Sequence, residues 1–61
     1  MWSITNKRTG ATENYSTRRE AETAARNHLA NLIMINGNIQ RNTDTYEVRE
    51  GDKLRSRISN R

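Results

Sequence analysis

The sequence predicts a small α+β domain of the order β-β-α-β-β, in which one helix packs on a sheet made of two antiparallel hairpins. Three observations predict this fold. Residues alternate between apolar and polar near both ends of the chain, a stripe of apolar residues at helical spacing lies between them, and glycines stand where the chain must turn. The whole chain, 1–61, fits a single domain whose small core must bury nearly every large apolar side chain.

The first hairpin is predicted at the start of the chain. Trp2 and Ile4 alternate with polar residues, as in a half-buried strand, and Gly10 suits the positive φ that the following turn usually requires. The returning strand ends at Tyr15. Pairing Tyr15 with Trp2 sets Glu13 opposite Ile4 on the buried face, so we expect a bulge or a solvated edge there.

The clearest predicted element is an amphipathic helix. Thr17 and Glu20 have the spacing of a capping box, and Ser16 is an alternative N-cap. The stripe that should face the core consists of Ala21, Ala25, His28, Leu29 and Leu32. On this stripe we expect His28 to be packed and half-buried rather than catalytic.

The end of the helix has two interpretations. We expect it to stop near Asn36, because Gly37 is a natural residue to follow a helix C-terminus. The alternative is a hairpin about Asn36-Gly37, which is a strong turn dipeptide. The helix end is favoured here because the hairpin would join segments of only about three residues, shorter than typical strands.

The second hairpin is predicted from the alternation of Tyr46 and Val48, followed by the turn Glu50-Gly51-Asp52. A three-residue loop would set Val48 opposite Leu54, Tyr46 opposite Ser56, Glu47 opposite Arg55 and Arg49 opposite Lys53. The outer face of the hairpin would then carry Arg49, Lys53, Arg55 and Arg57, with Glu47 as the only counter-charge.

The chain has more large apolar residues than the predicted core can contain. The predicted core is Trp2, Ile4, Ala21, Leu29, Leu32, Ile33, Tyr46, Val48, Leu54 and Ile58. Met34, Ile35 and Ile39 have no assigned place in it. Because a contiguous apolar remainder often marks an interface, we expect a homodimer.

Composition excludes several classes of site. The chain has no Cys and one His, so we expect no disulfide, metal or other cofactor. Its longest apolar run is far too short to span a bilayer and no signal-peptide pattern is present, so we expect no membrane and a cytoplasmic location. No catalytic constellation and no Gly-rich phosphate loop is found, so the chain is not expected to be an enzyme.

Charge is the best functional signal. The net charge is +4, and nine of the eleven cations are Arg, whose planar fork suits phosphates and base edges. A basic two-stranded ribbon fits the major groove, so we expect nucleic-acid binding, with duplex DNA favoured. The predicted contact residues are Lys7, Arg8, Arg49, Lys53, Arg55 and Arg57. The alternatives are charges that only protect a sheet edge from aggregation, and an inhibitor that docks on an acidic host protein.

The first third of the chain resembles the arm-type DNA-binding domains of tyrosine recombinases. The resemblance rests on Trp2, Thr9-Gly10, Tyr15, Ser16-Thr17 and Glu20-Ala21. That family places three strands before its helix and contacts DNA through the sheet, which implies a DNA-contacting role for Lys7 and Arg8. The short, Asn- and Arg-rich chain also resembles small accessory proteins of bacteriophages and mobile elements, which often inhibit host machinery in the host cytoplasm.

Overall fold

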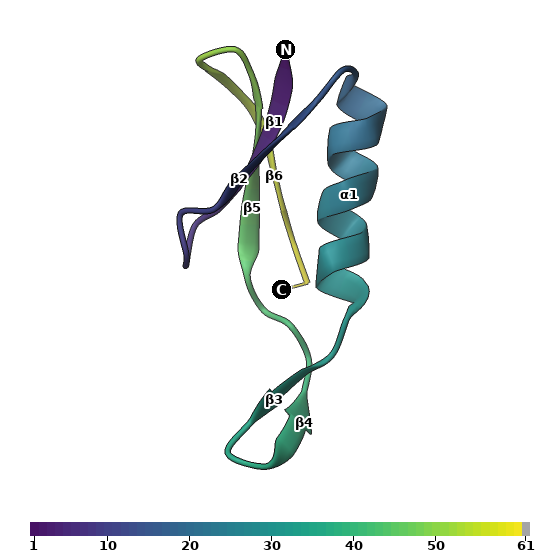
Figure 1. Ribbon diagram of the computed structural model, residues 1–61, viewed down its shortest axis with the longest axis vertical. Helices are drawn as coiled ribbons and strands as arrows, with labels where there is room; N and C mark the ends of the chain where they lie inside the picture. Colours follow the sequence, from purple (N-terminus) through teal and green to yellow (C-terminus); the bar gives the residue numbers. More distant parts are fainter. Residues whose placement is uncertain (61) are drawn as a thin grey trace.

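The computed structural model describes residues 1–60 and has two antiparallel sheets and one helix, which confirms the predicted α+β class. The larger sheet has the strand order β2-β1-β5-β6. Its strands are β1 (Trp2–Asn6), β2 (Thr12–Tyr15), β5 (Thr45–Glu50) and β6 (Lys53–Ser59). The helix α1 (Arg18–Ala30) lies along one face of this sheet (Figure 1), and β3 (Ile33–Ile35) and β4 (Asn38–Gln40) form the smaller sheet.

The core lies between α1 and the two central strands. Thr17 is the N-cap, as predicted, and its hydroxyl accepts a hydrogen bond from the backbone N–H of Glu20 at 3.2 Å. The helix buries Ala21, Ala25 and Leu29, while Ile4 of β1 and Val48 of β5 are fully buried opposite them. Because the alanines have no side chain beyond Cβ, the helix can approach the sheet closely.

The first hairpin has the predicted register and no bulge. Trp2 pairs with Tyr15, and Ile4 pairs with Glu13. Strand β2 is the sheet edge, and Glu13 is exposed there, where it accepts a hydrogen bond from the Tyr15 hydroxyl at 2.7 Å and lies 3.0 Å from Nε2 of His28. Of the two predicted outcomes, the solvated edge is the one observed. Glu13 lies opposite Ile4 but remains exposed to water because β2 is an edge strand.

The predicted end of the helix is wrong. The helix ends at Ala30, and the chain continues into the β3–β4 hairpin, whose turn residues Asn36 and Gly37 have φ values of 53° and 79°. Asn and Gly tolerate this left-handed conformation, so the Asn-Gly turn prevails although its strands have only three residues each. As a consequence Leu32 leaves the helical stripe and is 66% exposed.

The predicted register of the second hairpin is also wrong. The loop has two residues, Gly51 and Asp52, so Glu50 pairs with Lys53. The register then shifts between Val48 and Arg49, leaving Arg55 as an extra residue in β6. The resulting pairs are Arg49 with Leu54, Val48 with Ser56, Glu47 with Arg57 and Tyr46 with Ile58. The shift brings Ile58, rather than a serine, against Tyr46, and removes Leu54 from the core.

The two leucines that the sequence placed on one stripe should differ sharply in their contribution to stability. Leu29 is 3% exposed and packed under the helix, so Leu29→Ala should cost about 2–5 kcal/mol of unfolding free energy. Leu32→Ala should change it by about 0.5 kcal/mol or less, because the side chain is already in water. Urea denaturation of both variants checks this, and equal losses would contradict the observed end of the helix.

Candidate nucleic-acid interface

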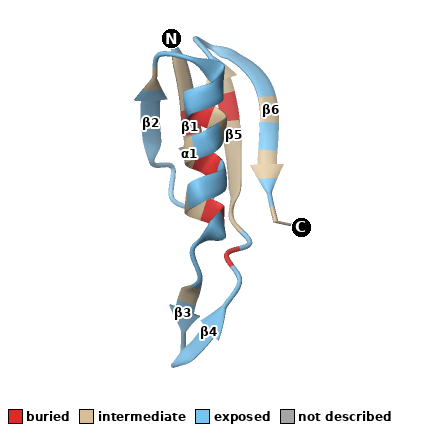
Figure 2. Cartoon of the chain, turned by 90° about the vertical axis from the view of Figure 1, so that its right-hand side faces the viewer, coloured by how far each residue is buried: buried red, intermediate tan, exposed pale blue. Residues whose placement is uncertain are grey.

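The sheet has one face that the helix leaves uncovered. Side chains alternate between the faces of a strand, so Trp2, Ile4 and Asn6 point toward α1 while Ser3 and Thr5 point away. In Figure 2 the helix lies over one side of the sheet, with β2 and β6 flanking it. From the strand register, the uncovered side carries Ser3, Thr5, Thr12, Asn14, Glu47, Arg49, Leu54 and Arg57, which we call the open face.

Two arginines on the open face share one carboxylate. The Glu47 side chain accepts hydrogen bonds from Nη2 of Arg49 at 2.9 Å and from Nε of Arg57 at 3.4 Å. Glu47 is only 12% exposed, whereas Arg57 is 60% exposed. The bond from Arg49 is the main reason that the pKa of Glu47 lies below its usual value. Both guanidinium groups are thus positioned by Glu47 and keep further N–H donors for another ligand.

Lys7 adds a third cation near this face. Its backbone N–H donates to the carbonyl of Thr45 at 3.0 Å, which ties the residue after β1 to the start of β5. Its charge also contributes to the lowered pKa of Glu47. Within residues 1–60 its ammonium group forms no ion pair. Lys7, Arg49 and Arg57 against Glu47 leave this region with two net positive charges.

Arg8 has a structural role in the same turn. Its guanidinium binds Asp44 through Nε at 2.8 Å and Nη2 at 3.0 Å. The Asp44 carboxylate also accepts from Nδ2 of the buried Asn6 at 3.0 Å, while the side-chain carbonyl of Asn6 accepts from the backbone N–H groups of Arg8 and Thr9. We call this set of contacts the Asp44 clasp. It fixes the first turn against the segment that enters β5.

Lys53 and Arg55 do not join the open face. Glu50 pairs with Trp2 on one side and with Lys53 on the other, so all three lie on the helix side of the sheet. Arg55, the extra residue of the bulge, donates to the Glu50 carboxylate from Nε at 3.1 Å and from Nη2 at 2.7 Å. The predicted four-cation face of the second hairpin is therefore divided between the two sides of the sheet.

Sequence reasoning missed the polar half of the open face. The alternation in the sequence predicts only that Ser3 and Thr5 lie on the polar side of a half-buried strand, and it assigns no role to Thr12 and Asn14. Thr5 and Thr12 are now seen to be cross-strand partners whose hydroxyls lie 3.0 Å apart. The same alternation that predicts the buried positions of β1 could have predicted this polar stripe.

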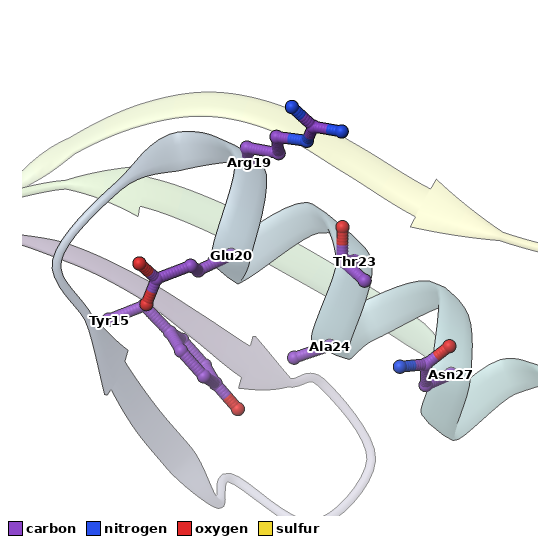
Figure 3. Close-up of a pocket in the computed structure, with 6 residues that line it drawn as sticks. All are labelled: Tyr15, Arg19, Glu20, Thr23, Ala24 and Asn27. Carbon is purple, nitrogen blue, oxygen red and sulfur yellow. The ribbon is translucent and has the colours of Figure 1, made fainter.

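Two further surface features are a groove beside the helix and a stacked histidine. An open groove of about 380 Å³ lies between β2 and the helix. It is lined by Tyr15, Arg19, Glu20, Thr23, Ala24 and Asn27 (Figure 3). His28 is half-buried, as expected, and stacks on Tyr46 with ring centroids 5.5 Å apart. In the described part of the chain, His, Asp and Glu side chains form no group of three that could hold a metal ion.

Comparison of the chain with protein-family models, with curated proteins and with solved structures returned no match. Across residues 1–60, α1 is the only helix, and it is neither long nor apolar enough to cross a membrane. The geometry of the open face is therefore the main basis for a functional proposal.

The Asp44 clasp predicts a pH dependence of stability. The hydrogen bond and charge of Arg8, with the bond from Asn6, lower the pKa of Asp44 below its ordinary 3.8 in the folded chain. This contribution is present above the unfolded pKa and is lost as pH falls through the folded pKa. Melting temperature should therefore fall more steeply below about pH 4 in the parent than in Asp44→Asn. Thermal melts from neutral to acid pH check this, and parallel curves would contradict it.

Proposed function

We propose that this protein is a non-catalytic nucleic-acid-binding protein that lays the open face of its sheet on duplex DNA. The observation that carries the proposal is the pair Arg49 and Arg57, held on an uncovered sheet face by a shared hydrogen-bond acceptor, Glu47. Their remaining N–H donors suit phosphate oxygens and the O6 and N7 edge of guanine. Binding of this kind requires neither a cofactor nor an enclosed pocket.

The polar residues around the arginines support the same function. Hydroxyl and amide side chains such as those of Ser3, Thr5 and Asn14 commonly contact phosphates and position a protein on the duplex. Sheets can present such side chains in the major groove, as β-ribbon proteins do. Lys7, at the end of β1, adds a further cation for the backbone, so the open face offers both charge and neutral donors.

The resemblance to the arm-type domains of tyrosine recombinases agrees with this use of the sheet, since that family contacts DNA through its sheet rather than its helix. In this chain the corresponding turn contains Lys7 and Arg8. Arg8 is engaged by Asp44, yet its side chain is 66% exposed and can bind a phosphate from the far side. Lys7 is therefore the stronger of the two candidates, with Arg8 at its margin.

Removing the two open-face arginines should reduce the electrostatic part of DNA binding. Arg49→Gln with Arg57→Gln should lower the slope of log affinity against log salt concentration by about 0.9 for each lost phosphate contact. Arg26→Gln is a matched control, because Arg26 lies on the exposed side of the helix with 64% side-chain exposure. Anisotropy titrations of a random duplex at several salt concentrations measure the slopes. An unchanged slope in the double variant would overturn the proposed interface.

The rival function, inhibition of a host protein through an acidic patch, predicts a different outcome of the same titrations. The parent would then bind duplex negligibly at physiological salt. It would still capture a partner from bacterial lysate treated with nuclease, and the Arg49→Gln, Arg57→Gln variant would lose that capture. DNA binding that depends on salt and on these two arginines would decide against the rival.

Glu47→Gln should strengthen DNA binding. The substitution keeps the shape of the side chain and one acceptor oxygen, but replaces the other oxygen by an NH2 donor and removes the only carboxylate of the open face. One of the two arginines therefore loses its partner and becomes free for phosphate. Repulsion between a carboxylate and a phosphate in water is worth about 1 kcal/mol at close range, so affinity should rise by up to about fivefold. The same titrations measure it. A loss of affinity would show that this face does not approach the phosphates.

A further inference from the structure

The β3–β4 hairpin is an apolar arm that stands apart from the rest of the molecule. In Figure 1 it extends beyond the helix and the larger sheet along the long axis, which spans 38 Å. Its two strands pack only against each other and not against any other helix or strand of residues 1–60. Met34 and Ile39 are nevertheless 70% and 66% exposed.

Three of the exposed apolar residues share one side of the arm. Met34 and Ile39 are direct cross-strand partners, so their side chains lie on the same side. Leu32 directly precedes β3, two positions before Met34, and we assign it to that side from the alternation of the strand it enters. We call Leu32, Met34 and Ile39 the arm face. A lone two-stranded hairpin is marginally stable in water, so a partner on this face would contribute to its order.

The edges of the arm lack the protection that the larger sheet has. Edge strand β6 carries Lys53 and Arg57, and edge strand β2 carries Glu13, so charges oppose the addition of another strand there. Residues 31–40, which contain the arm, include no charged residue. In a chain with 30% charged residues, this is the segment where another polypeptide can approach without burying a charge.

The residues of the arm favour a protein partner over nucleic acid or a lipid bilayer. Nucleic acid is disfavoured, because the arm has no cation to contact phosphate. A lipid bilayer is disfavoured too, because Asn36, Gly37 and Asn38 form the tip and would have to enter the hydrocarbon first. An uncharged, apolar protein surface remains as the complement.

We propose that the arm face binds the arm face of a second copy of this chain, giving a two-fold symmetric dimer. An isologous contact of this kind requires only that one surface be complementary to itself, and three apolar side chains without charge meet that condition. The arm face itself brings no like charges into direct contact, and the nearest charged residues, Arg8, Arg41 and Asp44, lie at the base of the arm. The arm also lies at the far end of the long axis, so the dimer leaves both open faces free.

The small size of the arm limits the affinity of this dimer. A standard interface uses about 20–30 residues a side, and the arm offers fewer, so the dissociation constant should be on the order of micromolar rather than nanomolar. The parent should therefore pass from monomer to dimer as its concentration rises through that range. Its melting temperature should rise with concentration at the same time, because association stabilises only the folded chain.

Sedimentation equilibrium from roughly 1 µM to roughly 1 mM tests the proposal. The parent should change from 7.1 kDa to twice that mass, and the variant Met34→Thr with Ile39→Thr should stay at 7.1 kDa. Threonine is β-branched and favours strands, so the arm can still form. Leu54→Thr is the control: Leu54 is also an exposed apolar residue, but it lies on the open face, and its variant should dimerise like the parent.

Three results would overturn the proposal. The parent could remain at 7.1 kDa with a melting temperature independent of concentration. The arm variant could dimerise as the parent does, or the mass could rise beyond two chains without limit. If the arm variant failed to fold, the mass and melting temperature of the parent would still decide whether the dimer exists. None of these outcomes depends on DNA binding, so the proposed function is tested separately.

Discussion

The packing of α1 on Ile4 and Val48 is the constraint on which the rest of this structure depends. The fully buried residues are few, and two of the helical ones, Ala21 and Ala25, contribute only a Cβ. A single helix of this kind can cover only one face of a four-stranded sheet. Residues 1–60 therefore form no second apolar layer on this sheet, and its other face must be polar enough to lie in water.

The polar face is organised by acid and base pairs rather than by apolar packing. Glu47 holds two arginines on the open face, while Asp44 holds Arg8 and Asn6 at the turn below it. Because the arginine partners are largely exposed, these pairs add only modestly to stability. Their main effect is on geometry, because they restrict where the guanidinium groups can point and so prepare them for a ligand. The net positive charge that remains attracts anionic partners from a distance.

The sequence predicted those parts of the fold that local chemistry decides. The cap at Thr17, the buried stripe from Ala21 to Leu29 and the pairing of Trp2 with Tyr15 each follow from spacing or alternation. The end of the helix could not be predicted in this way, because a helix stop at Gly37 and a turn at Asn36-Gly37 use the same residues. The completed molecule uses these residues for the turn, so the helix ends at Ala30 and Leu32 is exposed.

The candidate site was harder to predict because it depends on register. Two changes move Arg57 from its predicted place opposite Thr45 to the position opposite Glu47. The loop is one residue shorter than predicted, and β6 contains one extra residue, Arg55. The alternation of residues in β6 does not predict that bulge. The result is a division of the predicted cations, with Arg49 and Arg57 on the open face and Lys53 on the helix side.

The central claim is that DNA contacts the open face of the sheet and not the helix. Its most direct test is a titration of isotopically labelled protein with a short duplex, followed by amide and arginine side-chain NMR signals at low salt. The account predicts shifts at Ser3, Thr5, Arg49 and Arg57, with the exposed side of the helix at Thr23 and Arg26 unchanged. Shifts confined to the helix, or no shifts at any residue, would contradict it.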